Sequence, residues 1–193
     1  ADGFDAPDAA PRERFSFRQS RSRETAYSRD YDELYGLLRH EREHGRILWV
    51  LGPACTFDAD ARRAMSALIE RGYCHALLAG NALATHDLEA ALLGTALGQD
   101  IYTQRPAPNG HYHHIDVLNK VRACGSIPAF LDAYGIQDGI MHACVRSGVP
   151  FVLAGSIRDD GPLPQVYSDV YRAQDAMRAQ VREATTVLCV ATQ

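Results

Sequence analysis

Charged side chains follow directly after a short apolar segment near residue 155. The run from Phe151 to Ala154 ends in Gly155-Ser156, and Arg158, Asp159 and Asp160 come next. An apolar run bounded by Pro and Gly is typical of a buried strand. Open α/β sheets bind ligands at the carboxyl ends of their strands, where a guanidinium can bind a carboxylate or phosphate. We interpret the segment as a ligand site; a turn with a helix cap is the alternative.

Three other apolar runs end in small residues. These ends are Gly52-Pro53-Ala54, Gly80-Asn81-Ala82 and Ala191-Thr192. Glycine lets a ligand approach the backbone, and a helix that starts there offers free N–H groups to a phosphate. The dinucleotide fingerprint Gly-x-Gly-x-x-Gly is missing from the sequence. Tight turns between strands and helices therefore explain these glycines equally well.

Histidines and one acidic residue form two further candidate sites. The segment Gly110-His-Tyr-His-His114 lacks the second ligand pair of a typical zinc site, so we expect no metal. Hydrogen bonds within the loop, or contacts with polar groups of a ligand, are the better interpretation. His86-Asp87 follows the second strand end. Asp87 either meets an amine of a ligand or interacts with the dipole of the helix that starts there.

Strands alternate with helices along most of the chain. We expect strands at 47–51, 76–79, 151–154 and 186–191. We expect helices near 31–44, 58–71, 85–97, 115–124, 127–134, 139–147 and 168–183. Asp58 or Asp60, Thr85 and Ser126 are the expected helix caps. The pattern predicts an α/β fold: a doubly wound, mostly parallel sheet with helices on both faces and a helical insertion between Gly98 and Gly148.

Composition sets limits on the class of protein. The chain has 193 residues, 46% of them hydrophobic and 23% charged, and a net charge of −4. Without a basic excess we expect no nucleic-acid partner, and no apolar run approaches the roughly 20 residues of a membrane-spanning helix. The five cysteines are odd in number and form no Cys-x-x-Cys pair. This pattern is typical of reduced thiols, so we expect a cytoplasmic protein.

The two ends of the chain differ in character. Residues 1–25 are rich in Arg, Ser, Asp and Pro without apolar periodicity, so we expect a flexible N-terminal arm or linker. Residues 26–193 then form the folded domain. Because Gln193 comes directly after an expected strand, we expect this domain to be truncated at its C-terminus.

Taken together, the motifs resemble one family, the conserved region of lysine–oxoglutarate reductase/saccharopine dehydrogenase. It includes archaeal-type ornithine cyclodeaminases and the C-terminal domain of cyanobacterial arginine dihydrolase/ornithine cyclodeaminase enzymes. The resemblance runs from about residue 30 to the end of the chain. The motifs that carry it are Gly52-Pro53-Ala54, Leu78–Ala84, His86-Asp87, His113-His114, Gly125-Ser126-Ile127, Gly139-Ile140-Met141 and Pro150–Pro164.

The resemblance implies a Rossmann-like, NAD-binding domain that converts L-ornithine to L-proline and ammonia. It places Gly80, Asn81, Ala82, Asp160 and Thr192 at the cofactor. Two departures matter: the family continues past Ala-Thr into a further loop, and its arginine dihydrolase module has no counterpart in this sequence. We therefore expect a truncated nucleotide site and no hydrolysis of a guanidinium.

The strand-end pattern adds Gly52, Gly155 and Ser156 to the expected cofactor site. Ornithine cyclodeamination is redox-neutral, so NAD would take a hydride from the substrate Cα and return it after the δ-amine has displaced ammonia. We expect Asp159 or Asp87 at a substrate amine and Arg158 at its carboxylate. The sequence leaves open which carboxylate acts as the base.

We also expect a homo-oligomer, in which a partner subunit supplies residues that contact the substrate. Two alternatives remain: a non-catalytic nucleotide-binding or regulatory domain, and an NAD-dependent amino-acid dehydrogenase with another substrate.

Overall fold

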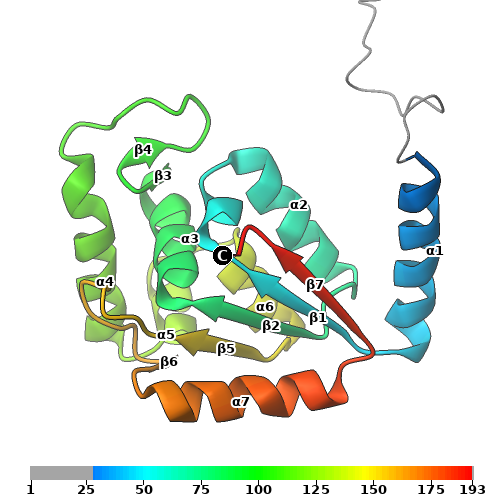
Figure 1. The fold of residues 1–193 in the computed structure, drawn as a ribbon. Coiled ribbons are helices and arrows are strands. Elements are labelled where there is room, and N and C mark those ends of the chain that lie inside the picture. The colour runs from blue at the N-terminus through cyan, green and yellow to red at the C-terminus, as the bar shows by residue number, and fades with distance from the viewer. Residues whose placement is uncertain (1–27, 193) are drawn as a thin grey trace, which may run out of the picture. The chain divides into compact units, whose positions relative to one another are not determined.

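The computed structural model describes residues 28–192 (Figure 1). The expected arm at 1–25 lies outside the described residues. The chain divides into two compact units, 1–37 and 38–193. The described part of the first unit is the N-terminal portion of helix α1 (Ser28–His44), and the other elements belong to the second.

A five-stranded parallel sheet forms the centre of the second unit. Its strand order is β6-β5-β2-β1-β7. The strands are β1 (Ile47–Leu51), β2 (Ala76–Gly80), β5 (Phe151–Ala154), β6 (Val166–Tyr167) and β7 (Thr186–Val190). From β1 the chain moves outward through β2 and β5 to β6, then returns to the other side of β1 as β7. This is the doubly wound order, with its switch point between β1 and β7.

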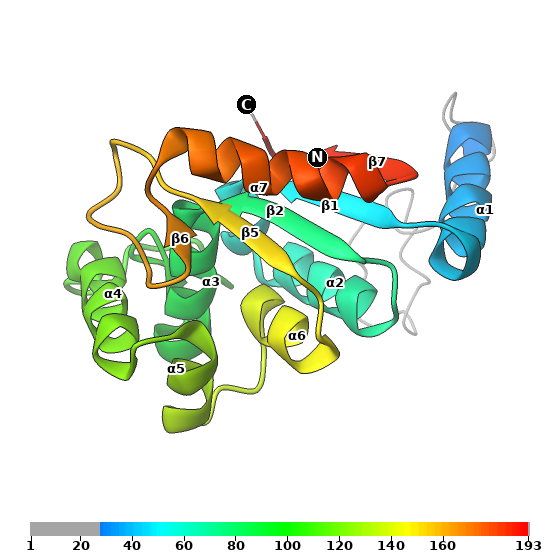
Figure 2. The ribbon, with the colours of Figure 1, turned by 90° about the horizontal axis from the view of Figure 1, so that it is seen from below.

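Helices cover both faces of the sheet, which confirms the predicted fold class. Figure 2 shows α7 on one face and α2, α3 and α6 on the other. The helices of this unit are α2 (Ala59–Glu70), α3 (Asn81–Leu93), α4 (His113–Cys124), α5 (Ile127–Ala133), α6 (Ile140–Ser147) and α7 (Val170–Glu183). Short elements complete it: 3-10 helices η1 (Pro53–Thr56) and η2 (Gly110–Tyr112), and the hairpin of β3 (Thr95–Ala96) and β4 (Gln99–Asp100).

Two predicted helix caps are confirmed and one is wrong. Asp58 accepts a hydrogen bond from the N–H of Ala61 at 2.8 Å, and Ser126 accepts one from Ala129 at 3.2 Å. Thr85, however, lies inside α3, because the helix begins directly at the end of β2 with Gly80 as its N-cap. The polar residues at the start of α3 made the segment look like a turn. The short strands β3, β4 and β6 were not predicted, since two residues show no periodicity.

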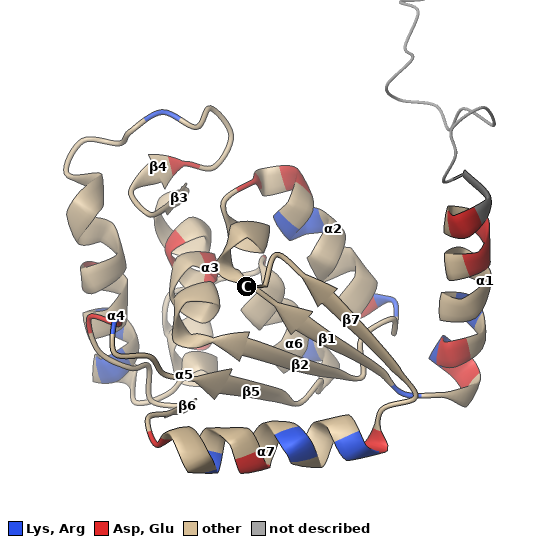
Figure 3. Ribbon diagram, viewed as in Figure 1, with Lys and Arg blue, Asp and Glu red and all other residues tan. Residues whose placement is uncertain are grey.

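The strands are apolar, and charge is confined to other parts of the second unit. The five strands of the main sheet carry no charged residue, while Figure 3 shows Lys, Arg, Asp and Glu on the helices and loops around them. Ile47, Leu48, Ala76 and Leu77 are fully buried. Within residues 28–192, no helix is long and apolar enough to cross a lipid bilayer.

The five cysteines are free, as expected for reduced thiols. Cys55, Cys74 and Cys144 are buried, Cys124 is half-buried and Cys189 is exposed. Burial raises the pKa of the Cys74 thiol to about 12. The buried thiols therefore behave as core residues.

Candidate functional site

A pocket lies at the switch point of the sheet, where the carboxyl ends of β1 and β7 meet. Its volume of about 560 Å³ is within the range of about 300–1,000 Å³ common for ligand sites. Phe57, Arg158 and Met177 form parts of its wall. Residues at the strand ends line the rest: Val50, Leu51, Gly52, Pro53, Ala54, Leu78, Ala79, Gly80, Ala154, Ala191 and Thr192.

Two glycines line this pocket for different reasons. A Cβ atom on Gly52 would lie 1.6 Å from the carbonyl oxygen of Ala191, so the chain after β7 can lie against residue 52 only because it has no side chain. Gly80 has a φ of −91°, which any residue can adopt. Its Cβ would meet the Ala154 carbonyl oxygen at 3.7 Å, an ordinary contact. The protein does not itself require glycine at position 80, whereas a ligand close to the backbone would.

The start of α3 forms part of the same wall. Gly80 is the N-cap of α3, and no side chain caps this end of the helix. The N–H groups of a first helical turn have no partner within the helix, and the helix dipole favours negative charge there. The pocket therefore offers a phosphate group both space and backbone donors.

The loop from Gly155 to Gln165 connects β5 with β6 and brings Arg158 to the pocket. Within this loop the Asp159 carboxylate accepts hydrogen bonds from the Ser156 N–H at 2.7 Å and the Ser156 hydroxyl at 3.1 Å. Both oxygens of Asp159 are therefore used to close a turn. In the structure Asp159 holds the turn that carries Arg158, and it does not line the pocket.

Helix α3 is buried almost all round although it carries five polar side chains. Asn81, Thr85, His86, Asp87 and Glu89 are each at most 7% exposed. Buried polar groups are costly unless they are hydrogen-bonded. The Thr85 hydroxyl has no partner, His86 bonds to Glu89 within the helix, and Asn81, Asp87 and Glu89 bond to other segments of the chain.

Asp87 belongs to an arginine cluster, which consists of Arg62, Asp87 and Asp138. Arg62 donates from Nε to Asp87 at 2.7 Å and from Nη1 to Asp138 at 2.5 Å. The Asp87 carboxylate also accepts hydrogen bonds from the first N–H groups of α6, at Ile140 (3.0 Å) and Met141 (2.7 Å). Asp87 is fully buried. In this structure it joins α2, α3 and α6, and its expected contact with a substrate amine stays a prediction.

Asn81 also bonds within the protein. Its amide nitrogen donates to the Gly161 carbonyl at 3.2 Å, and its amide oxygen accepts from the Leu163 N–H at 3.0 Å. The side chain therefore fixes the loop between β5 and β6 to the start of α3. Any contribution of Asn81 to a cofactor site passes through its backbone or through that loop.

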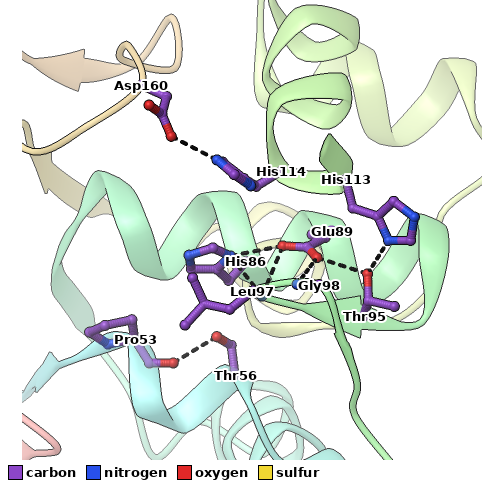
Figure 4. Close-up of polar contacts among 10 residues, drawn as sticks. All are labelled: Pro53, Thr56, His86, Glu89, Thr95, Leu97, Gly98, His113, His114 and Asp160. Atoms are coloured by element: carbon purple, nitrogen blue, oxygen red, sulfur yellow. Dashed lines mark hydrogen bonds and ion pairs between the residues drawn. The ribbon is translucent and has the colours of Figure 1, made fainter. Parts of the chain in front are cut away.

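A second group of polar residues, the histidine cluster, lies around the middle of α3 (Figure 4). The His86 Nδ1 atom is 2.8 Å from Glu89, whose carboxylate also accepts from the Thr95 hydroxyl at 2.8 Å and the Gly98 N–H at 3.0 Å. The cluster consists of His86, Glu89, Thr95, His113, His114 and Asp160.

The other members link this cluster to the pocket loop. The Thr95 hydroxyl is 2.8 Å from His113 Nδ1, and His114 Nε2 is 2.7 Å from the Asp160 carboxylate. Asp160 follows Arg158 by two residues in the loop, and its side chain is 60% exposed. Asp160, expected at a ribose, thus contacts His114 here and still has open surface for a ligand.

The hydrogen bonds of Glu89 favour its ionised form inside the protein. Burial alone would raise its pKa, but hydrogen bonds from His86, Thr95 and Gly98 together bring the pKa below its ordinary value. A fully buried carboxylate with these donors holds a stable negative charge next to an imidazole. Among the described residues, no three His, Cys, Asp or Glu side chains are placed to hold a metal ion.

Residues 35–193 match the family model described as arginine dihydrolase ArgZ-like, C-terminal, Rossmann fold. The chain belongs to this family. The match covers the sheet, the pocket and both polar clusters. The family predicted from the motifs is thereby confirmed.

Relatives of this ArgZ-like domain carry matching names. An ornithine cyclodeaminase of Methanopyrus kandleri is 46% identical over 155 residues, which are 80% of this chain and 37% of that protein. The crystal structure of a putative LOR/SDH protein from Methanococcus maripaludis has a TM-score of 0.77 at 41% identity, over 85% of this chain and 50% of that one. The chain thus spans half or less of the length of these relatives.

One solved relative is described as the ternary complex of AgrE with ornithine and NAD+. It has a TM-score of 0.78 at 38% identity, and the match covers 83% of this chain and 24% of that one. This likeness concerns the ArgZ-like domain as a whole.

The structure brings only some of the predicted site residues to the pocket. The predicted residues that line it are Gly52, Gly80, Thr192 and Arg158. Six others are close in sequence to lining residues but do not line the pocket: Asn81, Ala82, Gly155, Ser156, Asp159 and Asp160. Phe57, Met177 and the Glu89 carboxylate were not predicted. A His and a Glu at i and i+3 in an apolar helix, as in His86 and Glu89, were a usable signal for the last.

Proposed function

We propose that this chain forms the NAD-binding part of an ornithine cyclodeaminase, which converts L-ornithine to L-proline and ammonia. The observation that carries the proposal is the pocket at the switch point of an ArgZ-like domain, with a glycine at position 80 that the protein itself does not require. The names of the relatives supply the substrate and the cofactor.

The residues at this pocket fit a dinucleotide. Gly52 and Gly80 keep side chains out of the space, and α3 starts there without a side-chain cap. Thr192 adds a hydroxyl at the end of β7, and the exposed Asp160 carboxylate suits a ribose hydroxyl. When bound, NAD would supply a hydride acceptor and donor, which are chemical functions that side chains lack.

Ornithine carries a carboxylate and two amines, so the protein must offer a positive group to the first and negative groups to the others. We assign the carboxylate of ornithine to Arg158, which lines the pocket. Asp159 would position Arg158 through its bonds to Ser156. The exposed Asp160 carboxylate gives the neighbouring surface the negative charge that a diamine favours.

The reaction itself tests the proposal. L-Ornithine with a catalytic amount of NAD should yield proline and ammonia without accumulation of NADH, on this chain or on one extended past Gln193. NADH accumulation with an amino acid would identify a dehydrogenase instead. NAD binding without turnover in either chain would identify a nucleotide-binding domain. Either of these two results would overturn the proposal.

Two glycine variants test the position of the cofactor. Gly80→Ala should keep the fold and weaken NAD binding by about tenfold or more, because the new methyl group would occupy the space of the ligand. Gly36→Ala is the matched control, since a Cβ there meets no atom within 4 Å and residue 36 does not line the pocket. Unchanged NAD affinity in Gly80→Ala would remove this wall from the cofactor site.

A further inference from the structure

The orientation of the His86 ring follows from its bond to Glu89. An ionised carboxylate only accepts hydrogen bonds, so the 2.8 Å contact requires a proton on His86 Nδ1. The Leu97 N–H lies 3.4 Å from the same nitrogen and 3.2 Å from the Glu89 carboxylate. Because a protonated Nδ1 cannot accept, the Leu97 N–H donates to Glu89. A neutral His86 therefore carries its lone pair on Nε2.

The bonds on the far side of Glu89 make this arrangement rigid. The Thr95 hydroxyl donates to Glu89, so its oxygen accepts from His113 Nδ1. The Gly98 N–H donates to the same carboxylate. With its oxygens occupied and no exposed surface, Glu89 can change neither its position nor its partners without opening the protein.

His86 lies next to the pocket. Its ring meets the ring of Phe57 edge to face, with centroids 5.6 Å apart, and Phe57 lines the pocket. On another side the His114 ring lies 6.1 Å away and is bonded to Asp160 in the loop that carries Arg158. In Figure 4 the second nitrogen of His86 lies on the side of the ring away from Glu89.

We propose that His86 accepts the proton from the α-ammonium group of the amino-acid substrate and that Glu89 positions its ring and balances its charge. This inference rests on the proposed function and assigns the base that the sequence leaves open. In the proposed step His86 contacts the substrate, and Glu89 is a positioning residue.

The chemistry requires such a step. A carbon next to an ammonium group does not release hydride, because the nitrogen has no lone pair to stabilise the cation that forms. In the proposed step an N–H bond of the ammonium breaks, its electron pair stays on the nitrogen, and a new N–H bond forms at His86 Nε2. One positive charge moves from substrate to imidazole, where Glu89 offsets it. No oxidant or reductant is consumed in this transfer.

The two aspartates expected at an amine are less suitable. Asp87 is fully buried and bonded to Arg62 and α6, and Asp159 is bonded twice to Ser156. The groups that face His86 are Glu89 on α3, His114 on α4 with Asp160 behind it, and the neutral Phe57. His86 differs from these groups, because its Nδ1 is bonded to a buried carboxylate and its Nε2 is left free.

The protonation site of the ring is the first test, and it needs no turnover. Nitrogen-15 correlation spectra of the whole chain at neutral pH should show His86 with its proton on Nδ1, its signals assigned by their loss in His86→Gln. Glu89→Gln should shift the population toward the Nε2-protonated form. An Nε2-protonated His86 in the wild-type protein would overturn the inference.

Kinetics are the second test. His86→Asn should lower kcat with L-ornithine by about 100-fold or more, the range for loss of a general base. It should also remove the acid limb of the pH–rate profile while leaving NAD affinity unchanged. Glu89→Gln should lower kcat less and leave KM near the wild-type value. His111→Asn, which alters an exposed histidine outside the cluster, should behave as wild type.

The outcomes separate the two proposals. If the wild-type protein forms proline and His86→Asn does so at the same rate with the same pH profile, the inference fails and the proposed function stands. If the wild-type protein forms no proline, the proposed function fails and the proton transfer that rests on it fails with it, while the spectra still show whether Glu89 holds the proton of His86 on Nδ1.

Discussion

The arginine cluster and the histidine cluster hold two carboxylates that lie two residues apart on the same buried helix. Asp87 is paired with a guanidinium and with backbone N–H groups of α6. Glu89 is paired with an imidazole, a hydroxyl and backbone N–H groups. Arginine keeps its proton under all conditions that proteins meet, while histidine gains and loses one near neutral pH. The first cluster can therefore only hold elements together, and the second can also transfer a proton.

The surroundings of the two clusters reinforce this difference in role. Gly139, with a φ of +108°, leaves the space that the Arg62 guanidinium fills, since a Cβ there would lie 2.2 Å from Nη2. The pair of Arg62 and Asp87 is thus closed by the start of α6, and Asp138 is the exposed member of that cluster. In the histidine cluster, His86 borders Phe57 at the pocket, and Asp160 is the exposed member. Burial of a carboxylate does not by itself distinguish a structural role from a functional one; the partner does.

The largest effect on stability should come from Asp87→Ala. The variant leaves Arg62 buried without its main counter-charge, and breaking such a pair costs about 3–5 kcal/mol. Urea unfolding of the variant and of the wild-type chain measures the difference. Asp132→Ala is the control, because its pair with Arg146 is exposed and worth less than about 1 kcal/mol. Equal losses in the two variants would contradict the structural role of Asp87.

An intermediate effect should come from Glu89→Gln, and it should depend on pH. The folded pKa of Glu89 lies below the ordinary value of 4.5, so its charge stabilises the fold above pH 4.5 and this contribution is lost as pH falls through the folded pKa. At neutral pH the variant should lose about 1–3 kcal/mol, as expected for hydrogen bonds to a charged group. Below the folded pKa the two proteins should converge. A difference that stays constant across the acid range would show that Glu89 is not ionised.

The smallest effect should come from Asp138→Asn. Asp138 shares Arg62 with Asp87, but its side chain is 63% exposed, so solvent screening limits the pair to less than about 1 kcal/mol. Thermal unfolding of this variant should therefore stay near that of the wild type. A loss as large as that of Asp87→Ala would mean that Arg62 depends on both carboxylates equally.

The sequence was sufficient to predict four of the five strands of the main sheet and part of the pocket. Apolar runs marked β1, β2, β5 and β7 because these strands are short, apolar and bounded by Gly or Pro. Small residues at the ends of these strands, as at Gly52 and Gly80, marked the pocket, although Gly52 is required by the close approach of Ala191 and Gly80 by no contact within the protein.

The pairing of polar side chains could not be predicted, because it depends on the packing of α3. Asn81 bonds to Leu163, Asp87 to Met141 and His114 to Asp160, each across at least 46 positions in the chain. The motifs that carry the family resemblance are thus partners of one another. The sequence therefore showed neither the bonds of Asp159 to Ser156 nor those of Glu89 to His86, Thr95 and Gly98.

The loop between β5 and β6 contains no helix. The contacts described between this loop and helices α3 and α4 are made by side chains of those helices. Asn81 binds it on both sides of Pro162, His114 binds Asp160, and Arg122 donates to the Pro162 carbonyl at 3.2 Å. Segments held by few contacts open at lower free energy than the strands beneath them. We therefore expect a kinetic consequence: loss of these side chains should change how long a molecule stays in the pocket more than it changes the stability of the sheet.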